Sequence, residues 1–154
     1  RLGNRGAVDA DRQHFLRLMN PNATNGSNSV TLDFNATLQV GGGNRVIGSL
    51  VVGDPTGNAL TNQVIVENAA TSFGTLTINQ TVDAEWRALF RNGSTPNAYF
   101  DFDNATASTV LNLIKTGPAV ATMTQANTYT GFTQIGTANG ASGGTLRLGV
   151  GGSI

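Results

Sequence analysis

The stretch Gly74-Thr-Leu-Thr-Ile78 recurs along the chain with small changes, as GSLVV at 48–52 and as GTLRL at 144–148. A weaker copy, ATLQV, occupies residues 36–40. The three closer copies start 26 and 70 residues apart, and 70 residues make about three intervals of about 23. That interval suits one turn of a parallel β-helix, in which three short strands stack about 4.8 Å above the preceding set. The recurrence therefore predicts a solenoid of stacked strands.

Within each copy, the residue types predict which side chains enter the core. We expect glycine to turn the corner, and leucine and the later apolar residue to point inward. Leu50, Leu76 and Leu146 should then stack inside the solenoid, while Thr77 faces outward. The alternative is a chance recurrence in a sandwich rich in glycine and threonine.

Outside these copies, the composition of the chain also favours strands over helices. Its 154 residues are the length of one ordinary domain. Only 12% of residues are charged, and 57 are Gly, Thr or Asn, so a helical architecture rich in Ala, Glu, Lys and Leu is excluded. Short apolar runs, separated by Gly, Asn, Asp and Pro, predict about ten strands. The predicted strands are 30–40, 45–52, 63–67, 75–78, 87–90, 98–102, 109–114, 120–124, 133–135 and 145–148. We expect an all-β fold with about six turns over residues 30–154.

The charge balance and the residue types missing from the chain argue against several functional classes. Nine basic residues balance nine acidic ones, which argues against nucleic-acid binding. With no cysteine and a single histidine, His14, the chain has no thiolate nucleophile, disulfide or Cys/His zinc site. Its apolar runs are too short for a transmembrane helix. We expect no enzymatic activity.

Residues 1–29 form a separate N-terminal segment that caps or links the solenoid. Apolar residues at Phe15, Leu16 and Met19 are three to four apart, which favours a short helix ending before Pro21. The alternation of Phe15, Arg17 and Met19 fits a strand as well. A helical turn is also an alternative over residues 82–90, behind a possible cap at Asp83.

The stretch 111–148 carries a more specific pattern: LIKTG at 113–117, NTYTG at 127–131 and GTL at 144–146, followed by Leu148. In this order the motifs resemble the autotransporter-associated β-strand repeat of bacterial surface proteins, over about a quarter of the chain. Residues 44–50 resemble the strand that often starts such arrays. The resemblance implies a right-handed parallel β-helix at the bacterial cell surface or outside the cell, and it implies no particular ligand.

Two departures from the repeat occur within this stretch. The segment PAVATM at 118–123 replaces the usual Gly-x-Gly-Thr-Leu, and Phe132 replaces Gly or Asn. Because Pro118 has no N–H to donate to a ladder, the strand there must begin after it or Pro118 must lie at a corner.

The clearest candidate metal site is the run YFDFDN at 99–104. Strand alternation places Asp101 and Asp103 on one face, and with Asn104 they offer the oxygen ligands that calcium prefers. Paired carboxylates also serve glycoside hydrolysis. The simplest interpretation remains an exposed polar strand face, so calcium is the only cofactor we consider.

Aromatic and asparagine residues admit binding or structural roles. Trp86, near Arg87 and Arg91, could stack on a sugar, but packing in the core is the favoured interpretation. Tyr129 matches a stacking position of the repeat, so we expect it to be structural. Asn-x-Ser/Thr triplets begin at Asn22, Asn25, Asn35, Asn79, Asn92 and Asn104. We attribute them to asparagine turns and polar ladders between layers.

The end of the sequence predicts assembly. GTLRL at 144–148 is a core-type strand, and only six residues follow it, although solenoids need polar caps. We expect either a piece of a longer array or an end covered by a second copy, head to tail, giving an open homopolymer. The predicted contact residues are Phe15, Leu16, Met19, Leu146, Leu148, Val150 and Ile154. The leading function is a structural subunit of a filament, matrix or stalk. The alternative is an adhesin or carbohydrate-binding segment that contacts surface glycans.

Overall fold

The computed structural model describes residues 14–18, 27–33, 36–53, 64–70, 72–93, 110–137 and 142–154. Within these ranges the chain forms strands and no helix. The strands are β1 (His14–Leu18), β2 (Val30–Leu32), β3 (Ala36–Val40), β4 (Gly43–Ile47), β5 (Leu50–Val52), β6 (Ile65–Asn68), β7 (Gly74–Asn79), β8 (Ala84–Trp86), β9 (Leu89–Arg91), β10 (Leu111–Thr116), β11 (Val120–Met123), β12 (Thr133–Ile135) and β13 (Thr145–Leu148). The all-β prediction is confirmed for the described residues.

The expected N-terminal helix is wrong over the described residues, and the helical alternative at 82–90 is not formed. Residues 14–18 form β1, which pairs with β3 in register from His14↔Ala36 to Leu18↔Val40. The two-residue alternation in this segment therefore prevails over the helical spacing, because pairing with β3 satisfies its backbone groups. Residues 82–90 contain β8 and β9 with no helical turn between them. The predicted strand at 98–102 lies outside the described residues.

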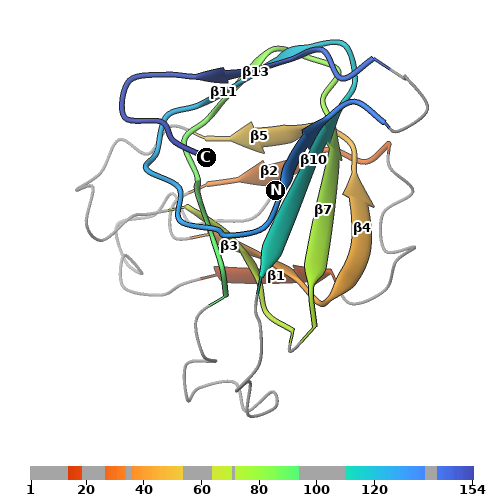
Figure 1. The fold of residues 1–154 in the computed structure, drawn as a ribbon, viewed down its shortest axis with the longest axis vertical. Helices are drawn as coiled ribbons and strands as arrows, with labels where there is room; N and C mark the ends of the chain where they lie inside the picture. Colours follow the sequence, from red (N-terminus) through yellow and green to blue (C-terminus); the bar gives the residue numbers. More distant parts are fainter. Residues whose placement is uncertain are drawn as a thin grey trace.

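Every strand ladder in the described ranges is parallel. The sheets have the orders β1-β3-β6-β9, β12-β10-β7-β4, β13-β11-β8 and β2-β5. Figure 1 shows β4, β7 and β10 side by side, with β2 next to β5. From β2 to β11 each pairing joins a strand to the third strand after it, as in β4 with β7 and β7 with β10. These paired strands are separated by two strands, whereas β1 and β3, β10 and β12, and β11 and β13 are separated by one.

The spacing between paired residues is less regular than the recurrence predicts. Leu113 pairs with Thr133, 20 residues later, whereas Leu76 pairs with Leu113, 37 residues later. The longer interval includes residues 94–109, which lie outside the described ranges. The three copies of the motif also do not stack on one another, since they lie in β5, β7 and β13 of three different sheets. The three leucines of these copies, Leu50, Leu76 and Leu146, thus reach the core from three different sheets.

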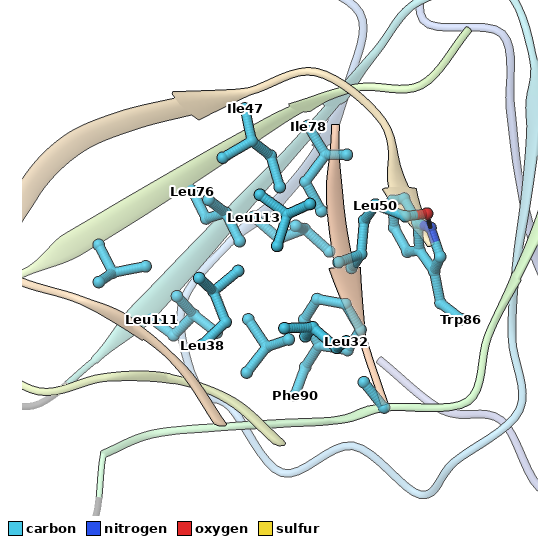
Figure 2. Close-up of a cluster of buried hydrophobic side chains, with 14 of the residues drawn as sticks. Leu32, Leu38, Ile47, Leu50, Leu76, Ile78, Trp86, Phe90, Leu111 and Leu113 are labelled. Atoms are coloured by element: carbon cyan, nitrogen blue, oxygen red, sulfur yellow. Dashed lines mark hydrogen bonds between the residues drawn. The ribbon is translucent and has the colours of Figure 1, made fainter. Parts of the chain in front are cut away.

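The inward side of the strands forms one apolar core. Burial alternates along β7, so Leu76 and Ile78 are buried while Thr75 and Thr77 are partly exposed, as predicted for Thr77. Figure 2 shows Leu76, Ile78 and Leu113 pointing into the same interior as side chains from other sheets. Leu50 is fully buried as predicted, whereas Leu146 is half-buried and packs against the core.

Trp86 belongs to this core, as the favoured interpretation held. Its side chain is fully buried, and its indole N–H donates to the carbonyl oxygen of Leu50 at 3.2 Å. The two residues lie together in Figure 2. The ring centroids of Trp86 and Phe90 are 5.7 Å apart, and those of Phe90 and Tyr129 are 6.4 Å apart. The three rings therefore form a continuous row within the core. A sugar-stacking role for Trp86 is excluded by this burial.

The LIKTG motif places a cation inside the fold. Lys115 points inward with Leu111 and Leu113, is fully buried, and donates from Nζ to the carbonyl oxygens of Gly143 at 2.6 Å and Gly117 at 2.9 Å. A third, longer contact at 3.3 Å reaches the carbonyl oxygen of Thr116. Burial lowers the pKa of this ammonium group, and the negative charge of Asp83 opposes that effect. Lys115 thus ties β10 to the turn that precedes β13.

Glycines at this corner are required by the backbone. Gly117 and Gly144 have φ angles of +82° and +58°, which favour glycine. A Cβ atom at Gly144 would lie 2.6 Å from the carbonyl oxygens of Gly117 and Ala119. The strand after Pro118 begins at Val120, as its missing N–H predicts.

Asparagine side chains brace successive layers. The Asn127 amide accepts from the backbone N–H of Phe90 at 2.8 Å and donates to the carbonyl oxygen of Ser153 at 2.7 Å. Asn92 accepts from the N–H of Thr130 at 3.1 Å. These bonds join side chain to backbone rather than forming the predicted ladders of identical residues. They supply partners for corner N–H groups that no strand satisfies.

Candidate functional site

The predicted metal site cannot be placed. Asp101, Asp103 and Asn104 lie outside the described residues. Among the residues that the structure does describe, no group of three or more His, Asp or Glu side chains could hold a metal ion. Calcium binding at 101–104 stays a prediction.

The predicted assembly residues fall into two groups. On the N-terminal side, the backbone of Phe15 lies in β1, Leu16 is half-buried against the core, and Met19 lies outside the described ranges. On the C-terminal side, β12 pairs with β10 and β13 pairs with β11, and these two strands end the order of their sheets. We call β12, β13 and the tail 149–154 the last layer.

The last layer exposes apolar side chains. Ile135 aligns with the buried Lys115, yet it is 51% exposed. Leu148 aligns with the buried Met123 and is 48% exposed, and Val150 is fully exposed. Exposed apolar side chains on the last strands of two sheets make this region a candidate interaction surface.

Backbone contacts hold the last layer to the layer before it. Gly149 donates to the carbonyl oxygen of Met123 at 2.8 Å, and Ser153 donates to that of Gln125 at 3.2 Å. Ile154 follows directly and is 62% exposed. The tail is therefore ordered on one side, while its apolar side chains remain accessible.

The opposite end of the stack differs. Leu18 in β1 and Val30 and Leu32 in β2 are buried. Arg45 in β4 points inward, where its Nε donates to the carbonyl oxygen of Leu18 at 2.8 Å. Among the described residues, four of the eight exposed large apolar side chains, Ile135, Leu148, Val150 and Ile154, belong to the last layer.

A second feature, which the sequence patterns did not single out, is a charged face on the outer side of β8, β11 and β13. Two adjoining hollows of about 480 and 470 Å³ share Asp83, Ala84 and Glu85 in their walls. The first hollow also includes Thr122 and Arg147. Their volumes lie in the range of small-ligand pockets. The alternation Asp83-x-Glu85-x-Arg87 was the available signal, because outward residues on one strand recur every second position.

The charges on this face are mixed. Asp83 accepts from the backbone N–H of Val120 at 2.8 Å, and Glu85 pairs with Arg87 at 2.8 Å with both side chains exposed. An exposed pair of this kind contributes only about 0 to 1 kcal/mol to stability. Arg147 aligns with Thr122, which aligns with Glu85, so the backbones of Arg147 and Glu85 lie two strand spacings, about 10 Å, apart. The face offers both charge signs to a polar ligand.

No helix in the described ranges is long and apolar enough to cross a membrane. Comparison of the chain with family models, with curated proteins and with solved structures finds no match. The chain is therefore characterised by its own geometry, and the last layer is the site that this geometry defines most clearly.

Proposed function

We propose that this chain is a structural β-helical subunit that stacks head to tail on a further copy at the cell surface or outside the cell, with no chemistry of its own. The single observation that carries the proposal is the last layer, where Ile135, Leu148 and Val150 expose apolar side chains at the end of two parallel sheets. A further parallel layer would bury them and extend the ladders of β12 and β13.

The strand pairing supports the β-helical part of the proposal. Six of the nine pairings in the described ranges (β2-β5, β3-β6, β4-β7, β6-β9, β7-β10 and β8-β11) join strands three apart in the sequence, which is the order that a coil of three strands per turn produces. Parallel crossovers in proteins are nearly always right-handed, so the proposed coil is right-handed. The resemblance to the autotransporter-associated repeat points to the same arrangement and to a bacterial surface.

Strand direction supports the head-to-tail part. A copy translated along the stack keeps all its strands parallel to those below it, so its β1, β2 and β4 edges would continue the existing ladders. The apolar insertion would come mainly from the last layer, since Leu18 and Leu32 at the other end are already buried. Such a contact is heterologous and repeats without closing, which gives a filament.

The test is the size distribution of the purified chain as its concentration rises. Sedimentation velocity and electron microscopy should show species that grow with concentration, and Val150→Asp should abolish growth without lowering the melting temperature. Val150 is fully exposed, so the charge has no effect on the isolated fold.

The matched control is Val82→Asp, because Val82 is 68% exposed but lies outside the last layer. This variant should assemble like the parent chain. A chain that stays monomeric at millimolar concentration, or that stops at a dimer, would contradict head-to-tail stacking. Equal loss of assembly in both variants would move the contact away from the last layer.

A further inference from the structure

The outer side of the β4, β7, β10 and β12 sheet differs from the charged face in carrying no charged residue at its outward positions. Inward Leu76 and Leu113 fix the alternation, so the even positions of β4, β10 and β12 and the odd positions of β7 face outward. These positions are occupied by Asn44, Val46, Thr75, Thr77, Asn79, Asn112, Ile114, Thr116 and Gln134. We call this surface the neutral face.

Two exposed phenyl rings belong to the same face. Phe73 directly precedes β7 and is 62% exposed, and Phe132 directly precedes β12 and is 51% exposed. Both backbones are fixed in the ladder, because the carbonyl oxygen of Phe73 accepts from Gly43 and that of Phe132 accepts from Leu113, each at 2.9 Å. The backbones that carry the two rings are therefore held by the sheet.

Register gives the separation of the two aromatic residues. Gly74 aligns with Leu111 and Leu113 aligns with Thr133, so Phe132 lies two strands above Phe73 and two residues further along the strand direction. With strands about 4.8 Å apart and about 3.3 Å per residue, the two backbones are about 12 Å apart on a diagonal.

Hydrogen-bonding groups lie beside this diagonal, because Thr75, Asn112 and Phe132 share one register position across β7, β10 and β12. Asn112 donates from Nδ2 to the Thr75 hydroxyl oxygen at 3.3 Å and accepts from the backbone N–H of Phe132 at 3.2 Å. The Thr75 hydroxyl keeps its own proton to donate, whereas Asn112 is only 9% exposed and serves to hold Thr75 and the backbone of Phe132. Thr77 offers a further hydroxyl one step along the strand.

Exposed phenyl rings next to uncharged hydroxyl and amide groups suit one class of ligand, neutral sugars. Phenyl rings cover the apolar C–H faces of sugars, and hydroxyl and amide groups exchange hydrogen bonds with sugar hydroxyls. A face without charge gives no Coulomb attraction to a polyanion or polycation, whereas a neutral glycan loses nothing by its absence. We propose that the neutral face binds a neutral polysaccharide chain that covers Phe73 and Phe132, with the hydroxyls of Thr75 and Thr77 contacting its hydroxyls.

Affinity electrophoresis tests the proposal with four soluble probes: a β-glucan, a mannan, a galactan and, as the charged comparison, a polyuronate. All measurements use the Val150→Asp background, so that the result does not depend on assembly of the chain. At least one neutral polysaccharide should retard the protein, and the polyuronate should retard it less. Phe73→Ala and Phe132→Ala should each weaken binding about tenfold or more, since each removes a ring that the sugar would cover.

The matched control is Val82→Ala, which removes an exposed apolar side chain from another surface and should leave binding unchanged. Melting temperature checks that the ring variants fold. The proposal is overturned if none of the neutral polysaccharides binds, if the polyuronate binds best, or if both ring variants bind like the parent chain. Loss of self-association when the ring substitutions are placed in the parent chain, without any glycan binding, would instead make the neutral face a contact between copies.

Discussion

The same five-residue pattern occurs in two strands whose apolar side chains differ in burial. GTLTI at 74–78 lies in β7, between β4 and β10, and its Leu76 and Ile78 are fully buried. GTLRL at 144–148 lies in β13, which pairs with β11, and its Leu146 is half-buried while Leu148 is 48% exposed. Burial of the motif therefore depends on whether another layer covers it, and the residues of the motif do not determine this by themselves.

The largest expected difference between the two layers comes from removing their leucines. Leu76→Ala should lower the free energy of unfolding by about 2 to 5 kcal/mol, because a fully enclosed side chain leaves a cavity. Leu146→Ala should cost about 1 kcal/mol, since its site is partly open to solvent. Urea unfolding of both variants, under conditions where the chain is monomeric, measures the pair. Equal losses would show that the last layer is as well covered as the middle.

A smaller effect is expected where the two layers are joined. Lys115→Met should lower the free energy of unfolding by about 1 to 3 kcal/mol, because the carbonyl oxygens of Gly117 and Gly143 lose their charged donor. The loss should be local: amide exchange should quicken in β12 and β13 more than in β7. Uniform quickening across all three strands would mean that Lys115 supports the whole fold rather than the last layer.

The smallest effect concerns Tyr129, which packs between the layers. Its hydroxyl contacts that of Thr133 at 2.6 Å, and burial raises the pKa of its phenol above the ordinary value of 10.0. Above pH 10 the unfolded chain loses the phenolic proton while the folded chain keeps it, so stability falls as pH rises. Tyr129→Phe should cost about 1 kcal/mol at pH 8 but remove this alkaline loss.

Melting curves between pH 8 and 11 measure the difference between the parent chain and Tyr129→Phe. The comparison between the two proteins is needed because Lys115 also titrates in this range. Its lowered pKa makes the free energy of unfolding rise with pH up to 10.5, which is opposite to the effect of Tyr129, and this contribution is the same in both proteins. Parallel pH profiles for the two proteins would contradict a raised pKa at Tyr129.

Much of the fold was predictable because local patterns fix strands. Glycine-bounded alternation predicted β7 and β13 and the inward direction of Leu76, and the missing N–H of Pro118 predicted where β11 begins. The N-terminal strand was missed because five residues fit both periods, and pairing with β3 decides between them. The stacking order was missed because loop length is not encoded by the motif.

The candidate sites were less predictable, since exposure depends on neighbours distant in sequence. Val150 and Leu148 were predicted as contact residues from the composition of the tail, yet their exposure depends on the absence of a covering layer in the described ranges. Phe73 and Phe132 differ little from core phenylalanines such as Phe90 until the register places them outward. Asp83 joins Arg147 in one hollow only through the pairing of three strands.

The central claim is that the last layer is an interface which a second copy covers. Hydrogen exchange at two protein concentrations tests this claim most directly. Amides of β7 should exchange at the same slow rate at both concentrations, because β4 and β10 already cover them. Amides of β12 and β13 should exchange quickly in the dilute sample and at least tenfold more slowly in the concentrated one, and Val150→Asp should remove this protection. Exchange in β12 and β13 that does not change with concentration would contradict the account.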